Sequence, residues 1–517
     1  MANANLFQSL KSKLLPATDT MNAEFAPAYA LSPKQQLAQY AATGCLNATY
    51  YASAQAQLDT VLALGKEVDA RFIAQTAIYC RERGYMKDMP ALLAAVLASK
   101  GAAELTPAFG RVIDNGKMLR NFVQIIRSGA TGRKSLGTRP KKLVQAWLNN
   151  ASEKALLSAA VGDNPSLADV VKMVHPKPAE AWREAFFAWL IGKPYNAANL
   201  PPAVKAFEAY KQDRSQPLPD VPFQMLTALD LQTADWAQIA RQGGWQMVRM
   251  NLNTFARHGV YELPGMTEAI AAKLRDPAAI AKAKVFPYQL LSACQSAGDN
   301  VPFAIREALQ DALEIALANV PALEGKVVVC PDVSGSMRWP VSGYRTGATT
   351  AVRCVDVAAL VAAAILRKNE DAVVLPFEVD VVKLGLNPRD TVLTNAQKLA
   401  SIGGGGTNCS APLAAMNKKR MQADLVVFVS DNESWIDATR HGATATMREW
   451  AVFKQRNPDA KLVCIDVTPN ATTQAKESKD VLNIGGFSDD VFNIIAAFAA
   501  GQLGAAQWVG EIESITI

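Results

Sequence analysis

The sequence predicts two architectures in one chain: an α-helical repeat region over residues 1–322 and a doubly wound α/β region with a parallel sheet over 323–517. In the first region apolar residues recur every three or four positions, as on one face of a helix. In the second region short runs of β-branched residues alternate with helical segments, as in a sheet covered by helices. With 517 residues, half of them hydrophobic, the chain can bury a separate core in each region.

The region before residue 322 shows helical periodicity throughout. Helices are expected in TVLALGKEVDARFIAQTAIYCRER, ALLAAVLASK, LVQAWLNN, AEAWREAFFAWLIG, FQMLTALDL, WQMVRMNLNTFARHG and AAIAKAKVFPYQLLSACQSA. Pro- and Gly-rich breaks such as GYMKDMP and HPKPAE separate them, and no strand is expected among them. Many short helices without a single heptad favour stacked helix pairs, an α-solenoid. A compact, irregular helical domain is the alternative.

After residue 322 strands and helices alternate. Strands are expected in KVVVCPDV, DAVVLPFE, VDVVKLG, DLVVFVSD and KLVCIDVT. Helices are expected in VDVAALVAAAILRKN, TNAQKLASI, SAPLAAMNKKRM and ATATMREWAVFKQ, with a last helix near DDVFNIIAAFAA. Such an order implies right-handed crossovers and a sheet covered on both faces. Ligand sites in these sheets lie beyond the carboxyl ends of the strands.

Five oxygen-bearing side chains are expected at that edge. Asp332, Ser334 and Ser336 follow the first strand, Thr407 follows the glycines at 403–406, and Asp431 ends the strand DLVVFVSD. Carboxylates and hydroxyls suit Mg²⁺ or another divalent cation, which prefers oxygen ligands and seldom receives all six from protein. The set predicts a metal site completed by an acidic partner. A turn-forming Ser334 or a phosphate-binding glycine loop is the alternative, although GxxxxGK[ST] is absent.

Basic residues are concentrated in the helical region. The net charge is +8 over residues 1–322 and −2 over residues 323–517. Residues 111–142 alone hold nine basic side chains and one acid, Asp114. Such a density suits a polyanion, because Lys and Arg neutralise phosphates. A solvated helix face is the alternative.

Further candidates for contacts with a polyanion lie downstream of this segment. His175, between Lys172 and Lys177 at a helix-breaking proline, could stack on a base or bond a phosphate, or could be a buried capping histidine. Arg249 and Arg257 are eight residues apart in WQMVRMNLNTFARHG and are expected on similar sides of one helix. The complete set of candidates for binding a polyanion, which the resemblance described below identifies as RNA, is Lys117, Arg120, Arg127, Arg133, Lys134, Arg139, Lys141, Lys142, Lys172, His175, Lys177 and Arg249.

Composition argues against several other classes of protein. The seven cysteines are scattered without a disulfide rhythm and are expected to be reduced core residues. Three widely separated histidines without HExxH make a zinc site improbable. The apolar run at 91–98 is too short for a membrane span, and no secretory signal is visible at the start. We therefore expect a cytoplasmic protein with no membrane association.

The metal-site motifs resemble the metal-ion-dependent adhesion site of von Willebrand factor A (vWA) domains. Three segments, PDVSGSM, GGGGTNCS and VVFVSDNESW, indicate a more specific family within this class. They resemble the Ro autoantigen family, in which an A domain closes a ring of HEAT-like helical repeats called the TROVE module. In the helical region, IIRSGATGRKSLGTRPKKLVQAWLNN, LADVVKMVHPKPAEAW and KVFPYQLLSACQS resemble successive helices of that module. The resemblance covers nearly the whole chain.

The resemblance implies a bacterial Ro-like RNA-binding protein that forms a monomeric ring. Its basic outer surface would bind small structured Y RNA, and its central hole would accept single-stranded 3′ ends of misfolded or decaying RNA. The implied partner is a 3′-to-5′ exoribonuclease such as polynucleotide phosphorylase. The metal ligands carried over are the five side chains named above, and the RNA-facing positions lie around Arg133, Lys141, Lys142 and the segment 172–177. Residues 338–353 appear longer and more basic than the corresponding connection in animal members.

Three functions remain in competition on sequence grounds. The leading hypothesis is a non-enzymatic RNA chaperone or scaffold, because no catalytic carboxylate cluster, His-centred nuclease pair or nucleotide loop is present. The second is a metal-dependent protein-binding module on a helical scaffold. A metal-dependent hydrolase that uses Asp332 and Asp431 is the third, and the absence of a positioned base argues against it.

Overall fold

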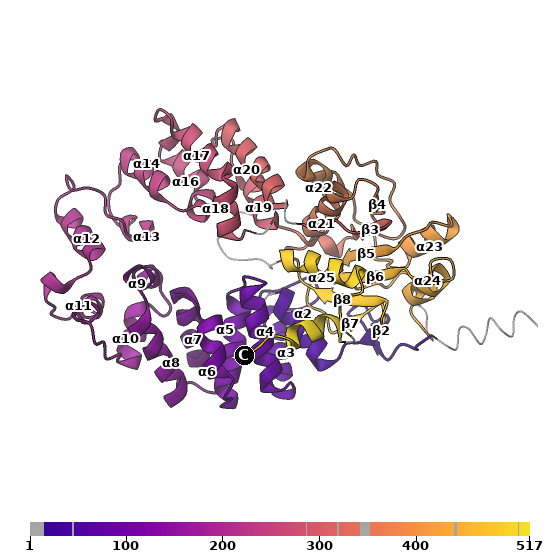
Figure 1. Cartoon of the computed structure of the whole chain (residues 1–517), viewed down its shortest axis with the longest axis horizontal. Coiled ribbons are helices and arrows are strands. Elements are labelled where there is room, and N and C mark those ends of the chain that lie inside the picture. Colours follow the sequence, from indigo (N-terminus) through magenta and orange to yellow (C-terminus); the bar gives the residue numbers. More distant parts are fainter. Residues whose placement is uncertain are drawn as a thin grey trace, which may run out of the picture. The chain divides into compact units, whose positions relative to one another are not determined.

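The computed structural model describes residues 15–43, 46–285, 287–317, 320–341, 352–438, 442–504 and 506–517. The chain divides into two compact units. One contains residues 69–274, 297–306 and 516–517, and the other contains residues 275–296, 307–515 and the N-terminal segment up to Val68. Figure 1 colours both units by sequence.

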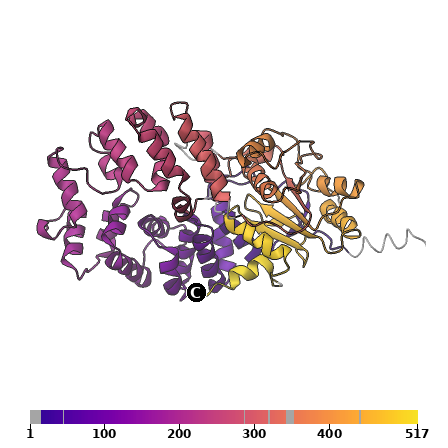
Figure 2. The same ribbon diagram turned by 45° about the horizontal axis from the view of Figure 1, so that its top comes forward.

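The first unit, which we call the helical unit, is a succession of short helices (Figures 1 and 2). Their bounds are α4 Ala70–Glu82, α5 Asp88–Lys100, α6 Leu105–Val112, α7 Gly116–Ser128, α8 Thr138–Asn150, α9 Glu153–Ala160, α10 Leu167–Val174, α11 Ala181–Leu190, η1 Ala197–Asn199, α12 Pro202–Gln212, α13 Phe223–Leu226, α14 Thr233–Gln242, α15 Trp245–Met250, α16 Leu252–Arg257, η2 Val260–Glu262 and α17 Met266–Arg275. Helix α5 packs on α4, α6 and α7, and is buried without interruption from Met89 to Ala98. A helix that is apolar on all sides in this way belongs in a core.

Cationic side chains connect helices that are separated in the sequence, because they donate hydrogen bonds to the carbonyl groups at the carboxyl end of an earlier helix. Arg183 of α11 is only 3% exposed, and its Nη1 donates to the carbonyl oxygens of Leu148 (2.9 Å) and Ala151 (2.7 Å) at the end of α8. Lys273 of α17 donates in the same way to the carbonyls of Ala240, Arg241 and Gly243 at the end of α14. The last carbonyls of a helix lack partners within it and carry partial negative charge, so cations stabilise them.

The second unit, which we call the α/β unit, contains a five-stranded parallel sheet in the order β4-β3-β5-β6-β8. Its strands are β4 Val373–Val374, β3 Val327–Pro331, β5 Leu425–Ser430, β6 Lys461–Asp466 and β8 Val481–Gly485. The helices that follow residue 322 are η4 Ser336–Arg338, α21 Cys354–Lys368, α22 Val392–Ala400, α23 Ala411–Lys418, α24 Ala445–Lys454, α25 Asp489–Ala499 and α26 Gln507–Glu513. Before them come α2 Pro33–Thr43, α3 Ala54–Glu67, α18 Pro277–Ala283, α19 Pro287–Ser296 and α20 Phe303–Ala316, whose first residues belong to the helical unit.

Helices cover both faces of this sheet. Successive side chains of a strand point to opposite faces, so strands that are apolar throughout need a helical layer on each face. Val328 and Cys330 of β3 belong to a core cluster that also contains Leu413 of α23 and Trp450 of α24. Helix α21 packs against β3, β4 and β5 and contacts α22. The doubly wound parallel sheet predicted from the sequence is therefore confirmed, as is the preceding run of helices.

The N-terminal segment is the largest departure from the sequence expectation. Strands β1 (Thr20–Met21) and β2 (Pro27–Ala30) form an antiparallel hairpin, and β2 pairs with β7 (Thr472–Thr473) of the α/β unit. Helix α2 packs on β8 and α26. The expectation of a strand-free region before residue 322 is wrong. Residues 15–68 and 275–296 also group with the sheet by contact, whereas the sequence division falls between residues 322 and 323.

Two further differences lie in the sheet itself. The prediction of a strand over residues 379–385 is wrong. This segment is a loop, with an isolated β-bridge between Phe377 and Val381. Strand β8 was not expected, because VLNIG is short and carries a polar residue at its centre. Of the basic insertion 338–353, residues 342–351 lie outside the described part, and its flanks are joined by hydrogen bonds from Val341 N to Val352 O (2.8 Å) and from Cys354 N to Trp339 O (2.9 Å).

Two expectations about composition can be compared with the described residues. Five of the six cysteines that the structure describes are buried, in agreement with a core role, whereas Cys45 lies outside these residues. Within the same residues, no helix combines the length and the apolar character that crossing a bilayer requires.

Replacing Arg183 with alanine should destabilise the helical unit strongly. The change leaves the Leu148 and Ala151 carbonyls without their hydrogen-bond donor. Unpaired buried acceptors lower the free energy of unfolding by on the order of 2–3 kcal/mol. Urea unfolding followed by tryptophan fluorescence measures this change, with Lys154→Ala at an exposed position as the matched control. A midpoint equal to that of the control would show that the Arg183 bonds contribute no net stability.

Candidate metal centre and nucleic-acid interface

Parallel pairing brings the two predicted carboxylate ligands to one edge of the sheet. Strands β3 and β5 are in register, with Pro331 opposite Val429. The next residue, Asp332, continues the pairing because its N–H donates to the Val429 carbonyl (2.9 Å). Asp431 follows the last residue of β5. The carboxyl ends of both strands therefore present their aspartates at the same place.

Hydrogen bonds tie the predicted hydroxyl ligands to this edge. Ser334 donates its backbone N–H to Asp332 Oδ1 (2.8 Å), and its Oγ lies 3.3 Å from that of Ser336. Thr407, from the glycine-rich loop, donates its hydroxyl to Ser334 Oγ (3.0 Å). The Ser336 hydroxyl also bonds to the Asp431 carboxyl. The structure thus brings all five predicted side chains together, and all five are buried.

Glycines place Thr407 beside the metal loop. Gly403 has φ +116°, and a Cβ on it would lie 2.0 Å from the Val333 carbonyl oxygen. Gly405 accepts a bond from Gly335 N (2.9 Å) and donates its own N–H to Glu378 Oε2 (2.7 Å). Because only a residue without Cβ adopts this conformation so close to another backbone, the loop depends on its glycines.

The electrostatics of the two aspartates favour a bound cation. Burial raises the pKa of Asp332 to about 6, against the opposing bonds from Ser430 and Ser334. Burial, reinforced by the charge of Asp332, raises the pKa of Asp431 well above its ordinary value. Within the described residues neither carboxyl forms an ion pair with a basic side chain. Two adjacent buried carboxyls without a counter-charge are costly, and a divalent cation would compensate them.

The donor set also fits the predicted ion. Two carboxylates and three hydroxyls offer only hard oxygen atoms, which suit Mg²⁺. In the described part of the chain no three His, Cys, Asp or Glu side chains form a metal-binding group. The arrangement therefore suits an oxygen-bound ion whose coordination is completed from outside the chain.

An apolar rim, which sequence reasoning missed, surrounds these ligands. Trp435 and Ile436 are 43% and 38% exposed, and their N–H groups donate to the Thr407 carbonyl (3.2 and 3.3 Å). The hairpin that carries the exposed Met21 and Phe25 is fixed to the same loop, because Asn22 Nδ2 donates to the Ser434 carbonyl (2.8 Å).

Beside Ser336 and Trp339, Tyr50 and Tyr51 extend the rim. The exposed Tyr50 ring packs edge-on against Trp339, which follows η4, with ring centroids 6.0 Å apart. The Tyr51 hydroxyl bonds to Ser336, and burial raises the pKa of Tyr51. The only signal in the sequence for these residues is a pair of adjacent tyrosines that fits no helical or strand period.

Three of the predicted RNA-binding arginines already bind backbone carbonyls. Arg133 donates to Ala98 O (2.9 Å), Arg139 donates to Gly101 O and Ala102 O (3.0 and 2.8 Å), and Arg120 donates to Val161 O (2.6 Å). These bonds give all three side chains a structural role within the helical unit. Whether their remaining N–H groups also contact RNA stays a prediction.

Most of the other candidates are exposed at neighbouring helices. Helices α8 and α10 are joined by bonds from Gln145 to Val174 O (2.6 Å) and from Asn149 to Lys177 O (3.5 Å), and Arg127 of α7 contacts Met173 Sδ (2.8 Å). Exposed cationic or imidazole side chains on or beside these three helices are Lys117, Arg127, Lys134, Lys142, Lys172, His175 and Lys177, whereas Lys141 is half-buried. We call the exposed set the basic surface.

The positions of His175, Arg249 and Arg257 can be compared with the predictions made for them from the sequence. His175 ends α10 in the left-handed conformation (φ 51°) and is exposed, so it is not a buried capping histidine. The single helix expected for Arg249 and Arg257 is wrong: α15 ends at Met250, and Asn251 separates it from α16. Arg249 is half-buried and Arg257 is exposed, so the spacing of eight residues does not place them on one helix face.

Comparison with known proteins gives three similarities. A family model of the Ro60 vWA domain matches residues 326–499. The RNA-binding protein RO60 of Deinococcus radiodurans is 27% identical over 92% of this chain and 94% of its own length. The crystal structure of the D. radiodurans Ro (RSR) protein superposes with a TM-score of 0.62 at 24% identity, over 91% of this chain and 100% of that one.

The structural match shows the fold, and the sequence match extends it along almost the entire chain. The metal-loop strand, the glycine-rich loop and the strand before Asp431 all fall inside the matched domain. The resemblance to the bacterial Ro-like RNA-binding proteins is therefore confirmed, and residues 326–499 match the family model of the Ro60 vWA domain.

Proposed function

We propose that this protein binds RNA through the basic surface of its helical unit. The observation that carries the proposal is the exposure of cations on or beside α10 and the two helices that it contacts, α7 and α8. Arg127 of α7 reaches Met173, the neighbour of Lys172 on α10, so the two cations lie on adjoining helices (2.8 Å from Arg127 Nη1 to Met173 Sδ). Closely spaced cations follow a phosphate backbone and supply sequence-independent affinity. The RNA-binding name of the D. radiodurans relative supports the same function.

The finer form of the proposal follows the resemblance. The RNA on the outer basic surface would be a small structured Y RNA, and the RNA in the central hole would be single-stranded 3′ ends of misfolded or decaying transcripts. The protein would act in the cytoplasm as a non-enzymatic chaperone or scaffold beside a 3′-to-5′ exoribonuclease such as polynucleotide phosphorylase. The chemistry of cutting RNA would then belong to the partner.

Reversing three charges of the basic surface should abolish most RNA binding. We expect the variant Lys142→Glu/Lys172→Glu/Lys177→Glu to lose at least tenfold in affinity and to lower the slope of log K against log[salt] by about 2–3, since each phosphate contact contributes about 0.9. Titration with the small RNA recovered with the protein from cells measures both quantities.

The matched control reverses three exposed lysines elsewhere, Lys193, Lys282 and Lys419, with the same change in net charge. Equal losses in both variants would attribute binding to overall charge and not to this surface. Recovery of no specific small RNA with the wild-type protein would contradict the Y RNA form of the proposal.

We propose as a second function that Asp332, Ser334, Ser336, Thr407 and Asp431 hold Mg²⁺ and dock a protein partner. When bound, the ion supplies an open coordination position for an acidic side chain. The chain contributes the apolar rim, with Trp435 and Ile436 beside the ligand loop. Exposed apolar groups around a polar centre are typical of protein interfaces. RNA fits this edge poorly, because the exposed or half-buried charges near it include Glu24, Glu378 and Asp380.

Removing one carboxylate should separate metal binding from RNA binding. Wild-type protein is expected to gain stability from Mg²⁺, by about 2.7 kcal/mol at a hundred times Kd. Asp332→Asn should lose this gain and should be more stable than wild type in EDTA, because it removes repulsion between buried carboxyls. Thermal unfolding with and without Mg²⁺ measures both, with Asp371→Ala at an exposed position as the control.

RNA affinity of the Asp332→Asn variant provides the second readout. It should stay within twofold of the wild-type value, since the metal and the basic surface are separate sites in the proposal. A folded variant with strongly weakened RNA binding would show that the metal itself contacts RNA.

A photo-crosslinker can identify what reaches the apolar rim. With benzoylphenylalanine in place of Ile436, we expect crosslinks in cells to a protein, and we expect Asp332→Asn to remove them. The same crosslinker at Val452, which is exposed to a similar extent (40%) on α24, is the control. Crosslinks to RNA, or protein crosslinks that persist without Asp332, would contradict metal-dependent protein docking.

A further inference from the structure

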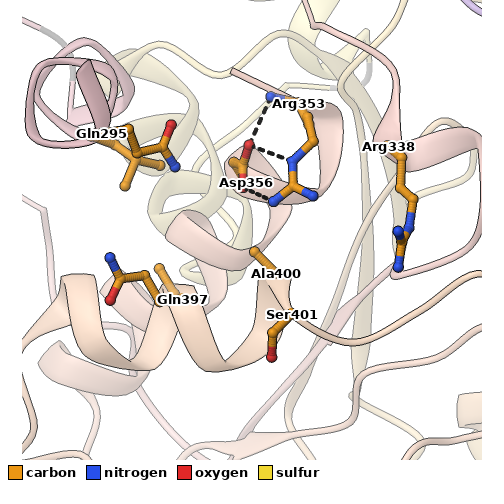
Figure 3. Close-up of a pocket in the computed structure, with 9 residues that line it drawn as sticks. Gln295, Arg338, Arg353, Asp356, Gln397, Ala400 and Ser401 are labelled. Atoms are coloured by element: carbon orange, nitrogen blue, oxygen red, sulfur yellow. Dashed lines mark hydrogen bonds and ion pairs between the residues drawn. The ribbon is translucent and has the colours of Figure 1, made fainter. Parts of the chain in front are cut away.

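A pocket in the α/β unit has a chemistry that neither RNA binding nor the metal site uses. It lies among α19, α21, α22 and η4 and has a volume of about 260 Å³ (Figure 3). The polar side chains that line it are Gln295, Arg338, Arg353, Asp356, Gln397 and Ser401. All of these elements belong to one compact unit, so the pocket is a property of that unit alone.

One end of the pocket carries two guanidinium groups. Arg353 donates hydrogen bonds to the Asp356 carboxylate from Nε (3.0 Å) and Nη2 (2.7 Å), and its Nη1 takes no part in this ion pair. Arg338 donates Nη2 to the Gly403 carbonyl (2.8 Å) and is otherwise exposed. Figure 3 shows the outer nitrogen of Arg353 turned toward Arg338.

A single carboxylate balances these two cations. Asp356 is 3% exposed, and its oxygens already accept three bonds, from Arg353 N, Nε and Nη2. It therefore has little capacity left for Arg338. Two guanidinium groups that face a common space with one engaged carboxylate leave an excess positive charge, which an anion between them would offset.

The other end of the pocket offers neutral hydrogen-bonding groups. Figure 3 places Gln295 and Gln397 on the side away from Arg338, with Ser401 at the end of α22. Ala396 and Ala400 of α22 supply an apolar wall beside them. Carboxamides both donate and accept, so they suit the edge of a heterocycle or the hydroxyls of a sugar.

We propose that this pocket binds a nucleoside monophosphate, with its phosphate between Arg338 and Arg353 and its nucleoside toward Gln295 and Gln397. Arginine presents several donors in a planar fork, which matches phosphate oxygens better than a lysine does. The volume of about 260 Å³ lies just below the usual range of small-molecule pockets, which begins at about 300 Å³, so the pocket has room for one nucleotide at most. The phosphate comes either from a free nucleotide or from the phosphorylated 5′ end of an RNA strand.

Titration of the full-length protein with AMP and UMP in EDTA tests the proposal. Isothermal calorimetry should show one site for at least one of the two nucleotides, at least tenfold tighter than for its nucleoside or for inorganic phosphate. Arg338→Gln should weaken this binding at least tenfold. Gln397→Glu, which places a negative charge at an exposed position of the lining, should weaken it as well. Arg389→Gln, at an exposed arginine outside the pocket, should leave it unchanged.

Each remaining outcome decides the matter. No binding at 10 mM, equal binding of nucleoside or phosphate, or undiminished binding in both pocket variants would overturn the proposal. A short RNA with a 5′ phosphate is then compared with the same RNA ending in a 5′ hydroxyl. A preference for the phosphate that Arg338→Gln removes identifies an RNA end as the source, and no preference identifies the free nucleotide. The two proposals are tested independently. If the basic-surface variants bound RNA as the wild type does, the outcome of the nucleotide titrations would not change.

Discussion

The register between β3 and β5 is the constraint on which the candidate metal centre depends. Parallel pairing with Pro331 opposite Val429 brings Asp332 and Asp431 out of the sheet at the same level, although they are 99 positions apart. The bond from Ser430 to Asp332 Oδ2 (2.5 Å) and the glycines of the 403–406 loop then set the remaining oxygens around them. A slip of one residue would turn an aspartate to the opposite face and disperse the set.

This edge of the sheet combines features that usually exclude each other. Its centre is buried and acidic, whereas its rim is apolar and carries the exposed Trp435, Ile436 and Tyr50, the last packed against the half-buried Trp339. A buried carboxyl pair is stable only with a counter-charge, and an exposed apolar rim is stable in water only at a cost in solvation. Both costs fall when a cation and a partner surface cover the edge together. The local chemistry therefore explains why metal and partner would act as one unit.

The sequence was most informative where local signals coincide with the global fold. Runs such as VVVC and LVVFVS are buried strands, and the polar residues directly after them could be assigned to one edge by topology alone. Packing by the N-terminal segment could not be predicted, because β1 and β2 have two and four residues and show no periodicity. Counting charges also could not separate Arg133, which holds the Ala98 carbonyl, from Lys142, which is exposed, since both contribute equally to a basic segment.

The pairing of β2 with β7 also bears on how the protein is made. Tyr29 and Ala30 find their partners at Thr473 and Thr472, more than 440 residues later, so the α/β unit is incomplete until nearly the whole chain has left the ribosome. The helices between Asp69 and Leu274 pack mainly on near neighbours and can fold during synthesis. Until β7 emerges, one edge of β2 lacks the strand that pairs with it in the folded protein, and an unpaired edge can pair with other chains.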